Sequence, residues 1–334
     1  MKQEIQEFLA FAVGDLPLPA NTETLSGFIA WAQREHIMGQ VAAVIDAEPG
    51  SKLSDICENA KLRSSYDRRM LTYETDRIKR ALLGTGVEPI LLKGSAYVAE
   101  HLFAGVGRRV SDIDILVEES DLEQVEALLK EAGWQPEATT ENEYDQRYYR
   151  RWMHELPPLR HAVRRTIIDI HHRLLPRTSR LNPDHLEMIK EARAIEGEAL
   201  RVLSPTDRFI HSAIHVFGDG AMETPARSFL ELYYLYKDLS KAEGQALYAR
   251  AIEVRSDGPV AAALWVLRQY FGLDIADEGQ GLPSLRLRFL IRQLAENRRY
   301  RRLAEILLYI RSHYMRMPVR QLARHLWHKA IRRA

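Results

Sequence analysis

The spacing of hydrophobic residues changes twice along the chain, which divides it into three regions. Residues 1–83 carry apolar side chains at roughly helical intervals, as at Phe28, Trp31, Ile37, Val41 and Val44. A second helical stripe through Leu71, Ile78 and Leu82 ends at Gly84 and Gly86. We therefore predict an N-terminal helical region over residues 1–83.

A different pattern occupies residues 84–181. VEPILLKGS is a short apolar run between Pro89 and Gly94, as expected of a buried strand. DIDILVEE alternates polar and apolar residues, TIIDIHH reads as another strand, and further strands flank the turn at Pro157 and Pro158. AYVAEHLF and DLEQVEALLKEAGW between them read as helices. This pattern predicts a small α/β module.

Residues 182–334 return to helical spacing, and only ALRVL near 199–203 suggests a strand. Residues 285–334 contain fourteen Arg or Lys and two Glu, so this segment is basic. These helices could bind RNA, DNA or an acidic protein surface. The simpler interpretation is that the arginines are solvated while apolar side chains pack inward, namely Leu303, Ile306, Leu307 and Ile310.

Composition narrows the class of protein. A chain of 334 residues suits two or three structural units, and a formal net charge of +1 gives no general attraction to nucleic acid or membranes. No apolar run approaches the ~18 residues of a membrane-spanning helix, and Glu4 and Glu7 are atypical of a signal peptide. The single cysteine, Cys57, cannot form an internal disulfide. We therefore expect a cytoplasmic protein without a membrane span.

Three carboxylates in the α/β module have a pattern typical of a metal site. Asp112 and Asp114 lie at positions i and i+2 of a predicted strand, so both project from one face and can bind the same hard cations. Asp169 interrupts the apolar run around Ile168 and Ile170, where an unpaired buried charge would cost several kcal/mol. A lone Asp-x-Asp is common, so the prediction depends on the combination.

Residues beside the carboxylates could contact a nucleotide. Gly94 and Ser95 follow a strand and begin a helix, where the backbone can approach a phosphate. Lys93 could neutralise a phosphate or could be a solvated strand-end lysine. Arg108 and Arg109 precede the Asp pair, and an arginine fork suits phosphate. Each arginine could equally be a solvated loop residue.

Histidines nearby have weaker assignments. His171 shares a strand face with Asp169 and could orient that carboxylate, although a structural histidine is at least as consistent with the sequence. His211 and His215 have a spacing that can bind zinc on a helix, but no Glu or Cys accompanies them in the usual pattern. We therefore do not assign a metal site to that pair.

The segments LLKGSA, RRVSDIDILVEESD, the helix ending in EAGW, and IIDIHHRL resemble the DNA-polymerase-β-like nucleotidyltransferase superfamily, in particular a largely uncharacterised bacterial branch. The resemblance is strongest over about 88–175. More weakly, HSAIHVFGDGAMETPARSFLELYYL is similar to a helical pair with an Arg and an acidic residue in that branch. The resemblance implies an α+β fold with a small mixed-sheet core over 84–181, flanked by helical regions over 1–83 and 182–334.

The resemblance also implies a chemistry. Asp112, Asp114 and Asp169 would bind Mg²⁺ or Mn²⁺, and Gly94 and Ser95 would contact the triphosphate of an NTP. The expected reaction transfers an NMP, with AMP from ATP favoured, to a hydroxyl-type acceptor and releases pyrophosphate. The acceptor could be a small molecule, a peptide, a protein or an RNA end. If the Asp pair acts only through metal, Ala at position 112 or 114 should abolish transfer while leaving folding near normal.

Two other functions fit parts of the sequence. An interaction protein could keep the nucleotidyltransferase fold without catalysis, although all three carboxylates are present. A metal-dependent glycosyltransferase could also use Asp-x-Asp, but it would need a nucleotide-binding fold upstream, where residues 1–83 read as helices.

Overall fold

A mixed sheet carries the predicted site residues. The computed structural model describes residues 2–137, 149–197, 199–219, 222–275, 281–296 and 299–318. Over these residues the sheet has seven strands in the order β3-β4-β5-β2-β1-β7-β6. Their bounds are β1 Ile90–Leu91, β2 Asp112–Leu116, β3 Trp134–Pro136, β4 Leu159–His161, β5 Ile167–His171, β6 Arg193–Ala194 and β7 Arg201–Val202.

The sheet combines parallel and antiparallel pairings. β2 runs parallel to β5 and β1 runs parallel to β7, whereas the remaining neighbours are antiparallel. The last two strands at one edge of the sheet, β7 and β6, come from residues beyond 181, where the sequence pattern predicted mainly helices. β7 lies within the expected 199–203 strand, but β6 was missed because a two-residue strand is too short to show a period of two.

The N-terminal region consists of four helices, in agreement with the sequence pattern. They are α1 Lys2–Val13, α2 Thr22–Arg34, α3 Met38–Val44 and α4 Lys52–Ala81. The apolar pattern suggested one continuous run through Phe28 and Val44, but the chain breaks between α2 and α3. His36 adopts a left-handed backbone there, with φ 59°. Helical spacing alone does not reveal such a break, because both helices bury the same stripe.

A buried carboxylate at this break ties the N-terminal helices to the downstream ones. Glu35 accepts a hydrogen bond from the Ala226 backbone N–H at 3.2 Å and from the Arg301 guanidinium at 3.0 Å. On the other side, Arg164 forms a two-pronged ion pair with the buried Glu74 of α4, at 2.5 and 2.8 Å. Both links cross between regions that are distant in the sequence.

Short helices connect the central strands. α5 spans Lys93–Ala99 and α6 spans Leu122–Glu131, with 3₁₀ turns at Phe103–Gly105 and Glu119–Asp121. Asp121 is the N-cap of α6, but its side chain makes no capping hydrogen bond. The helix is followed by Gly133 with φ 100°, in the left-handed region that favours glycine.

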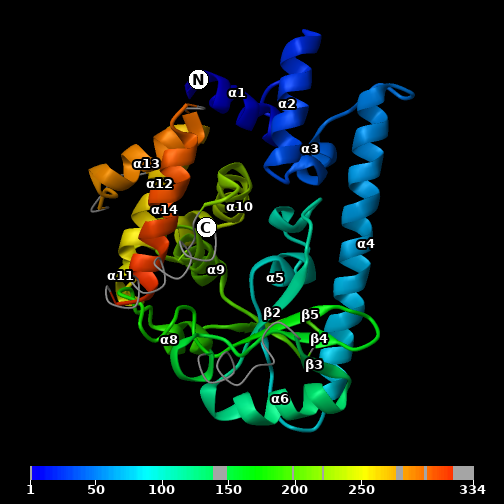
Figure 1. Cartoon of the computed structure of the whole chain (residues 1–334), viewed down its shortest axis with the longest axis vertical. Helices are drawn as coiled ribbons and strands as arrows, with labels where there is room; N and C mark the ends of the chain where they lie inside the picture. Colours follow the sequence, from blue (N-terminus) through cyan, green and yellow to red (C-terminus); the bar gives the residue numbers. More distant parts are fainter. Residues whose placement is uncertain are drawn as a thin grey trace, which may run out of the picture.

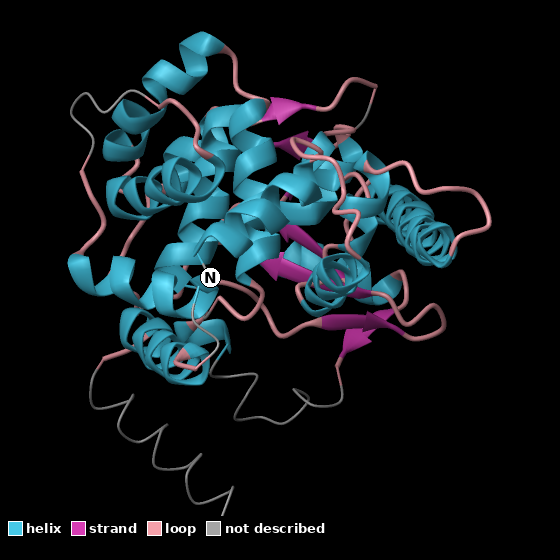
Figure 2. Ribbon diagram, turned by 90° about the horizontal axis from the view of Figure 1, so that it is seen from above, coloured by secondary structure: helices cyan, strands magenta, loops and turns pink. Residues whose placement is uncertain are grey.

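The downstream region is helical apart from β6 and β7. Its helices are α8 His185–Lys190, α9 Pro205–Ala213, α10 Pro225–Lys237, α11 Lys241–Glu253, α12 Asp257–Phe271, α13 Leu285–Glu296 and α14 Arg301–Arg316. A π-helical turn, Ile214–Asp219, continues α9. Figure 1 shows these helices on one side of the molecule and α4 along the other, with α5 and the sheet between them. Figure 2 shows helices on both sides of the central strands.

The basic C-terminal helices pack differently from the sequence expectation. Leu303, Ile306 and Leu307 of α14 are exposed, whereas Ala304, Leu308 and Ser312 are buried. The buried stripe of α14 is thus rotated from the one predicted. Residues 319–334 lie outside the described part of the chain.

The fold is α+β with flanking helices, as predicted. Buried side chains from all three regions join one hydrophobic core, in which Ile113, Ile115, Ile168 and Ile170 contribute the apolar face of β2 and β5. Within the described residues, every helix is too short or too polar to cross a membrane.

Candidate active site

Three aspartates come together on one face of the central parallel strand pair. In the register of β2 and β5, Asp114 lies opposite Asp169, and Asp112 lies two residues before Asp114. Residues paired in this way project to the same side of a sheet, as do residues at i and i+2. The alternating isoleucines occupy the opposite, buried face. The local period of the sequence therefore determines which side carries the carboxylates.

Asp114 is the most buried of the three and is held by two partners. Its Oδ1 accepts from Lys93 Nζ at 2.7 Å and lies 2.9 Å from His171 Nε2. Burial acts to raise the pKa of Asp114, but the charge of Lys93 and the hydrogen bond from His171 lower it well below its usual range. Likewise the pKa of Lys93 is raised despite burial, chiefly by Asp114. Asp114 is thus an ionised carboxylate at neutral pH.

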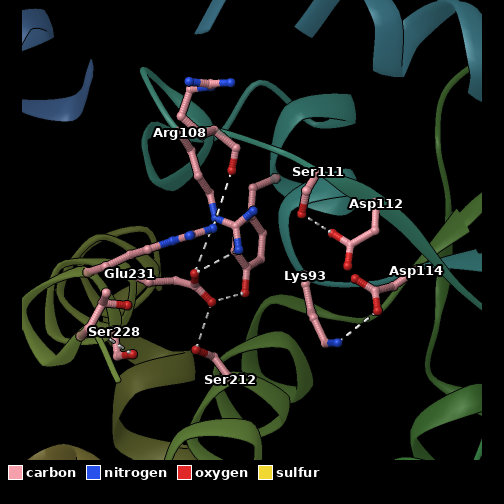
Figure 3. Close-up of polar contacts among 12 residues, drawn as sticks. Lys93, Arg108, Ser111, Asp112, Asp114, Ser212, Ser228 and Glu231 are labelled. Atoms are coloured by element: carbon pink, nitrogen blue, oxygen red, sulfur yellow. Dashed lines mark hydrogen bonds and ion pairs between the residues drawn. The ribbon is translucent and has the colours of Figure 1, made fainter. Parts of the chain in front are cut away.

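Asp112 and Asp169 have fewer partners. Asp112 is partly exposed and accepts from the Ser111 hydroxyl at 2.9 Å (Figure 3). Asp169 Oδ1 is buried and has no hydrogen-bond partner among the described residues. Burial, followed by the charges of Glu155 and Asp114, raises the pKa of Asp169 to about 7. The Asp169 carboxylate therefore lies in an environment with excess negative charge, which a bound cation would relieve.

A cleft of about 300 Å³ opens beside the Asp pair. Asp112 and Asp114 line one side with Lys93, Gly94 and Ser111, and the other side comes from the downstream helices. The residues from that second side are His215, Val216, Thr224, Arg227, Ser228 and Glu231. The cleft is polar and lies between the α/β module and the helical region that follows it.

Arg108 crosses the cleft floor to Glu231 of α10. Its Nε and Nη2 lie 3.3 and 3.2 Å from Glu231 Oε2, and the Tyr97 and Ser212 hydroxyls donate to Oε1 at 2.8 and 3.1 Å (Figure 3). Burial opposes the charged form of Glu231, but Arg108 and the Tyr97 hydrogen bond lower its pKa. Arg108 therefore lines the site as a paired, fixed cation.

Gly94 allows Arg108 to occupy this position. A Cβ on Gly94 would lie 1.8 Å from Arg108 Nη1, so any side chain there would displace the guanidinium. The loop that carries Arg108 is itself placed by a glycine contact, because a Cβ on Gly39 or Gly107 would lie 2.1 Å from the other residue's carbonyl oxygen. Both glycines are needed for close backbone packing of α3 against this loop.

The remaining predicted nucleotide-binding residues lie elsewhere. Arg109 forms an ion pair with Asp67 of α4 and is exposed, away from the residues that line the cleft. Ser95 is buried, and its hydroxyl has no hydrogen-bond partner among the described residues. Three consecutive residues at the start of α5 thus have different surroundings. Lys93 and Gly94 face the cleft, whereas the Ser95 side chain is buried in the protein.

Arg227 is the main cleft residue that the sequence did not single out. It is partly buried, and its guanidinium donates to the Arg109 carbonyl at 3.3 Å. No described carboxylate lies within ion-pair distance of it. Burial and the neighbouring Arg108 lower the pKa of Arg227. Its segment resembled a helical pair with an Arg and an acidic residue, but the sequence alone did not show that Arg227 and Glu231 face Asp112.

Glu155 was also missed, because it lies before the Pro157-Pro158 turn in a segment without strand periodicity. An isolated bridge pairs Glu155 with His171 at the end of β5, which brings its carboxylate 3.6 Å from His171 Nδ1. Of the two histidines with zinc-like spacing, His211 is buried, whereas His215 faces the cleft.

A known protein family matches most of the chain. No curated protein matches the chain. A family described as "Uncharacterised nucleotidyltransferase" matches residues 22–272, which include the N-terminal helices from α2, the whole sheet, and α8 to α12. Because the match covers most of the chain and every residue of the cleft, the protein belongs to this uncharacterised nucleotidyltransferase family.

Proposed function

We propose that this protein transfers an NMP, with AMP from ATP expected, to a hydroxyl-type acceptor in a metal-dependent reaction that releases pyrophosphate. The observation that carries the proposal is the convergence of Asp112, Asp114 and Asp169 on one face of β2 and β5 beside a polar cleft. Family membership supports the reaction class.

The three carboxylates suit Mg²⁺ or Mn²⁺, which prefer oxygen ligands. Oδ1 of Asp169 is buried, and no described residue donates a hydrogen bond to it. A metal ion would supply the missing partner. When bound, such ions would hold the triphosphate and lower the pKa of the attacking hydroxyl. Asp112 is partly exposed and lines the cleft, so it would meet the metal–nucleotide complex directly.

The cations across the cleft suit a triphosphate. Lys93 and Arg108 are each paired with a carboxylate, so much of their charge is already neutralised. Arg227 has no such partner among the described residues and lies beside the hydroxyls of Thr224 and Ser228 in the cleft lining. A guanidinium can donate two parallel hydrogen bonds to phosphate, so we assign Arg227 to the triphosphate.

In the proposed reaction the acceptor oxygen forms a bond to the α-phosphorus, and the bond from that phosphorus to the bridging oxygen breaks. Pyrophosphate leaves with the electron pair of the broken bond, and the acceptor hydroxyl gives up its proton to the Asp169 carboxylate. Through the metal ions that they would bind, the carboxylates would position the reacting groups on one side of the cleft, and Arg227 would neutralise charge on the leaving pyrophosphate. This arrangement is catalysis by positioning and electrostatic stabilisation.

The acceptor can be a small molecule, a peptide, a protein side chain or an RNA end. The basic helices α13 and α14 would favour a nucleic-acid acceptor. Cys57 is free and buried, which suits the reducing cytoplasm where we expect the enzyme to act.

The two rival functions have less support. A glycosyltransferase would need an upstream nucleotide-binding sheet, whereas α1 to α4 precede the first strand. A non-catalytic interaction protein would have no use for three convergent carboxylates beside a cleft lined by cations. The following experiment distinguishes such an interaction protein from an enzyme.

Calorimetric titration of ATP with and without Mg²⁺ tests the binding step, and the proposal requires that binding depend on the metal. Incubation with each α-³²P-labelled NTP and a cell extract then tests transfer, because the product that gains label identifies both base and acceptor. Asp112→Asn is the matched negative control, since it removes one carboxylate charge at a partly exposed position. Metal-independent binding, or equal labelling by wild type and Asp112→Asn, would contradict the proposal.

A further inference from the structure

A second cluster of metal-binding side chains lies at the far end of β5, beside the three aspartates. The segment before the Pro157-Pro158 turn crosses this strand end. The Leu156 N–H donates to the Ile170 carbonyl at 2.9 Å, and the His172 N–H donates to the His154 carbonyl at 2.9 Å. These backbone bonds bring the side chains of His154, Glu155 and His171 together.

Asp114 determines which nitrogen of His171 is available. Because Asp114 is an ionised acceptor, the His171 Nε2 that lies 2.9 Å from it must carry a hydrogen. In a neutral ring the other nitrogen, Nδ1, then presents a lone pair. That nitrogen lies 3.6 Å from Glu155 Oε2, which is too far for a good hydrogen bond. Burial lowers the pKa of His171, but the Asp114 hydrogen bond and the charge of Glu155 raise it overall. Nδ1 is thus a basic nitrogen that faces a carboxylate oxygen, and a metal ion bound there would take the place of its proton.

His154 adds a third donor to the same place. Its Nε2 lies 3.7 Å from Glu155 Oε2, and its ring centroid lies 5.3 Å from that of His171. The other nitrogen, Nδ1, is buried without a hydrogen-bond partner among the described residues. At 3.7 Å, His154 Nε2 does not donate a full hydrogen bond to the Glu155 carboxylate.

We propose that His154, Glu155 and His171 bind a divalent transition-metal ion, with Zn²⁺ the best match, at a site separate from the Asp112–Asp114 pair. Ligand atoms around Zn²⁺ at ~2.1 Å stand about 3.4 Å apart in a tetrahedral arrangement, close to the 3.6 and 3.7 Å found here. All three ligand atoms lie within 4.8 Å of one another, so small side-chain rotations would complete the set.

The donor types separate this site from the aspartates. Two imidazoles and one carboxylate suit Zn²⁺ or a similar transition metal, whereas the all-carboxylate group suits Mg²⁺ or Mn²⁺. The contact between Asp114 and His171 is the carboxylate–histidine arrangement that orients metal-binding imidazoles in proteins. Asp114 would thus serve both sites, directly at one and through His171 at the other.

The ion would join the 154–156 segment to β5. It would also place positive charge between Glu155 and His171, next to the carboxylate-rich face of the sheet. Three protein ligands leave one position of a tetrahedral ion for water or a substrate group. This inference does not depend on the proposed transfer reaction, because it rests only on the geometry of these three side chains.

The test uses the full-length chain after removal of bound metal with a chelator. Titration with Co²⁺ is followed by visible absorption, which reports nitrogen coordination, and titration with Zn²⁺ is followed by calorimetry. Wild type should bind one more equivalent of either ion than His154→Gln or Glu155→Gln binds. We expect each of these variants to lose at least about 100-fold in affinity for that ion.

Two further variants control for position. His172→Gln changes the next residue of the chain, which lies on the opposite side of the strand end, and should bind metal like wild type. Asp112→Asn should also keep the Co²⁺ signal, although it should lose nucleotide transfer. Thermal unfolding of the metal-free proteins would show whether each variant is folded before its affinity is compared.

Wild type that binds neither Co²⁺ nor Zn²⁺ would overturn the inference, as would equal binding by wild type and His154→Gln. Binding that disappears in Asp112→Asn and persists in both cluster variants would place the ion at the aspartates and also overturn it. A protein with no transferase activity but with the expected Co²⁺ pattern would support this site while contradicting the proposed function.

Discussion

The Arg108 guanidinium donates to the Glu231 carboxylate, a residue 123 positions later in the chain, at 3.2 and 3.3 Å. This pair joins the loop before β2 to helix α10 across the floor of the cleft. Both side chains are largely buried, and Tyr97 and Ser212 complete the hydrogen bonds of the carboxylate. The two walls of the proposed nucleotide site are therefore fixed relative to each other by one ion pair.

Glu231→Gln should destabilise the protein strongly. It leaves the buried Arg108 charge without its partner, a change that typically costs about 3–5 kcal/mol. Tyr97→Phe removes only one hydrogen bond to the same carboxylate and should cost about 1 kcal/mol. Urea unfolding of both variants measures the difference. Equal and small losses would mean that Arg108 is not held by Glu231.

Gly94→Ala should weaken ATP binding by displacing Arg108. The new Cβ would lie 1.8 Å from Arg108 Nη1, so the guanidinium must move away from the N-terminal turn of α5. Gly258→Ala is a matched control, because nothing lies within 4 Å of its new Cβ and alanine is favoured in a helix by about 1 kcal/mol. Thermal unfolding and ATP titration should show loss at position 94 and a small gain in stability at 258.

Asp112 and Asp114 should respond differently to substitution, unlike the equal behaviour expected from sequence. Asp112→Ala removes a partly exposed carboxylate and should change stability by less than about 0.5 kcal/mol. Asp114→Ala leaves Lys93 and His171 without their shared acceptor and should cost about 3 kcal/mol. Both should abolish transfer. Denaturant unfolding in the absence of metal measures the stabilities, and similar values would contradict the assignment.

Arg227→Gln should reduce affinity for ATP·Mg²⁺ by about 10- to 100-fold, since a charge-assisted hydrogen bond contributes about 1.5–3 kcal/mol. Stability should change little, because no described carboxylate pairs with this guanidinium. Arg255→Gln, on an exposed ion pair with Asp184, is the charge-matched control. Unchanged ATP affinity in Arg227→Gln, measured by calorimetry, would remove Arg227 from the triphosphate site.

Stability should fall on acidification partly because of His211. Burial lowers the pKa of His211 most, and the positive charges of Lys93, His215 and His171 lower it further. Asp114 acts in the opposite direction, and the resulting pKa is about 3. The unfolded histidine has a pKa of about 6.5, so between these values the unfolded state binds more protons than the folded state. The stability that goes with a neutral, buried His211 is therefore fully present above about pH 6.5, and it is lost as the pH falls toward 3.

From this residue alone we expect about 1–2 kcal/mol less stability at pH 5 than at pH 7. His211→Gln should reduce the pH dependence of the free energy of unfolding by that amount. An unchanged slope in His211→Gln would show that this histidine does not titrate as argued.

The sequence by itself determined the elements that local spacing defines. Alternation in DIDIL placed Asp112 and Asp114 on one face, and the apolar neighbours of Asp169 marked it as a buried strand residue. These features depend only on the period of a strand, which the chain carries locally. Helices α4, α6 and α10 were predictable because helical spacing is also a local property of the chain. The order of helical and strand patterns along the chain predicted the α+β class.

Tertiary structure decided which of the neighbouring polar residues meet. Arg108 faces the cleft while Arg109 pairs with Asp67, a distinction set by how the loop packs at Gly39 and Gly107. The approach of Glu155 to His171, and of Arg227 to the aspartate side of the cleft, joins segments with no shared periodicity. Local spacing cannot encode such contacts, because they arise from the packing of whole helices and strands against one another.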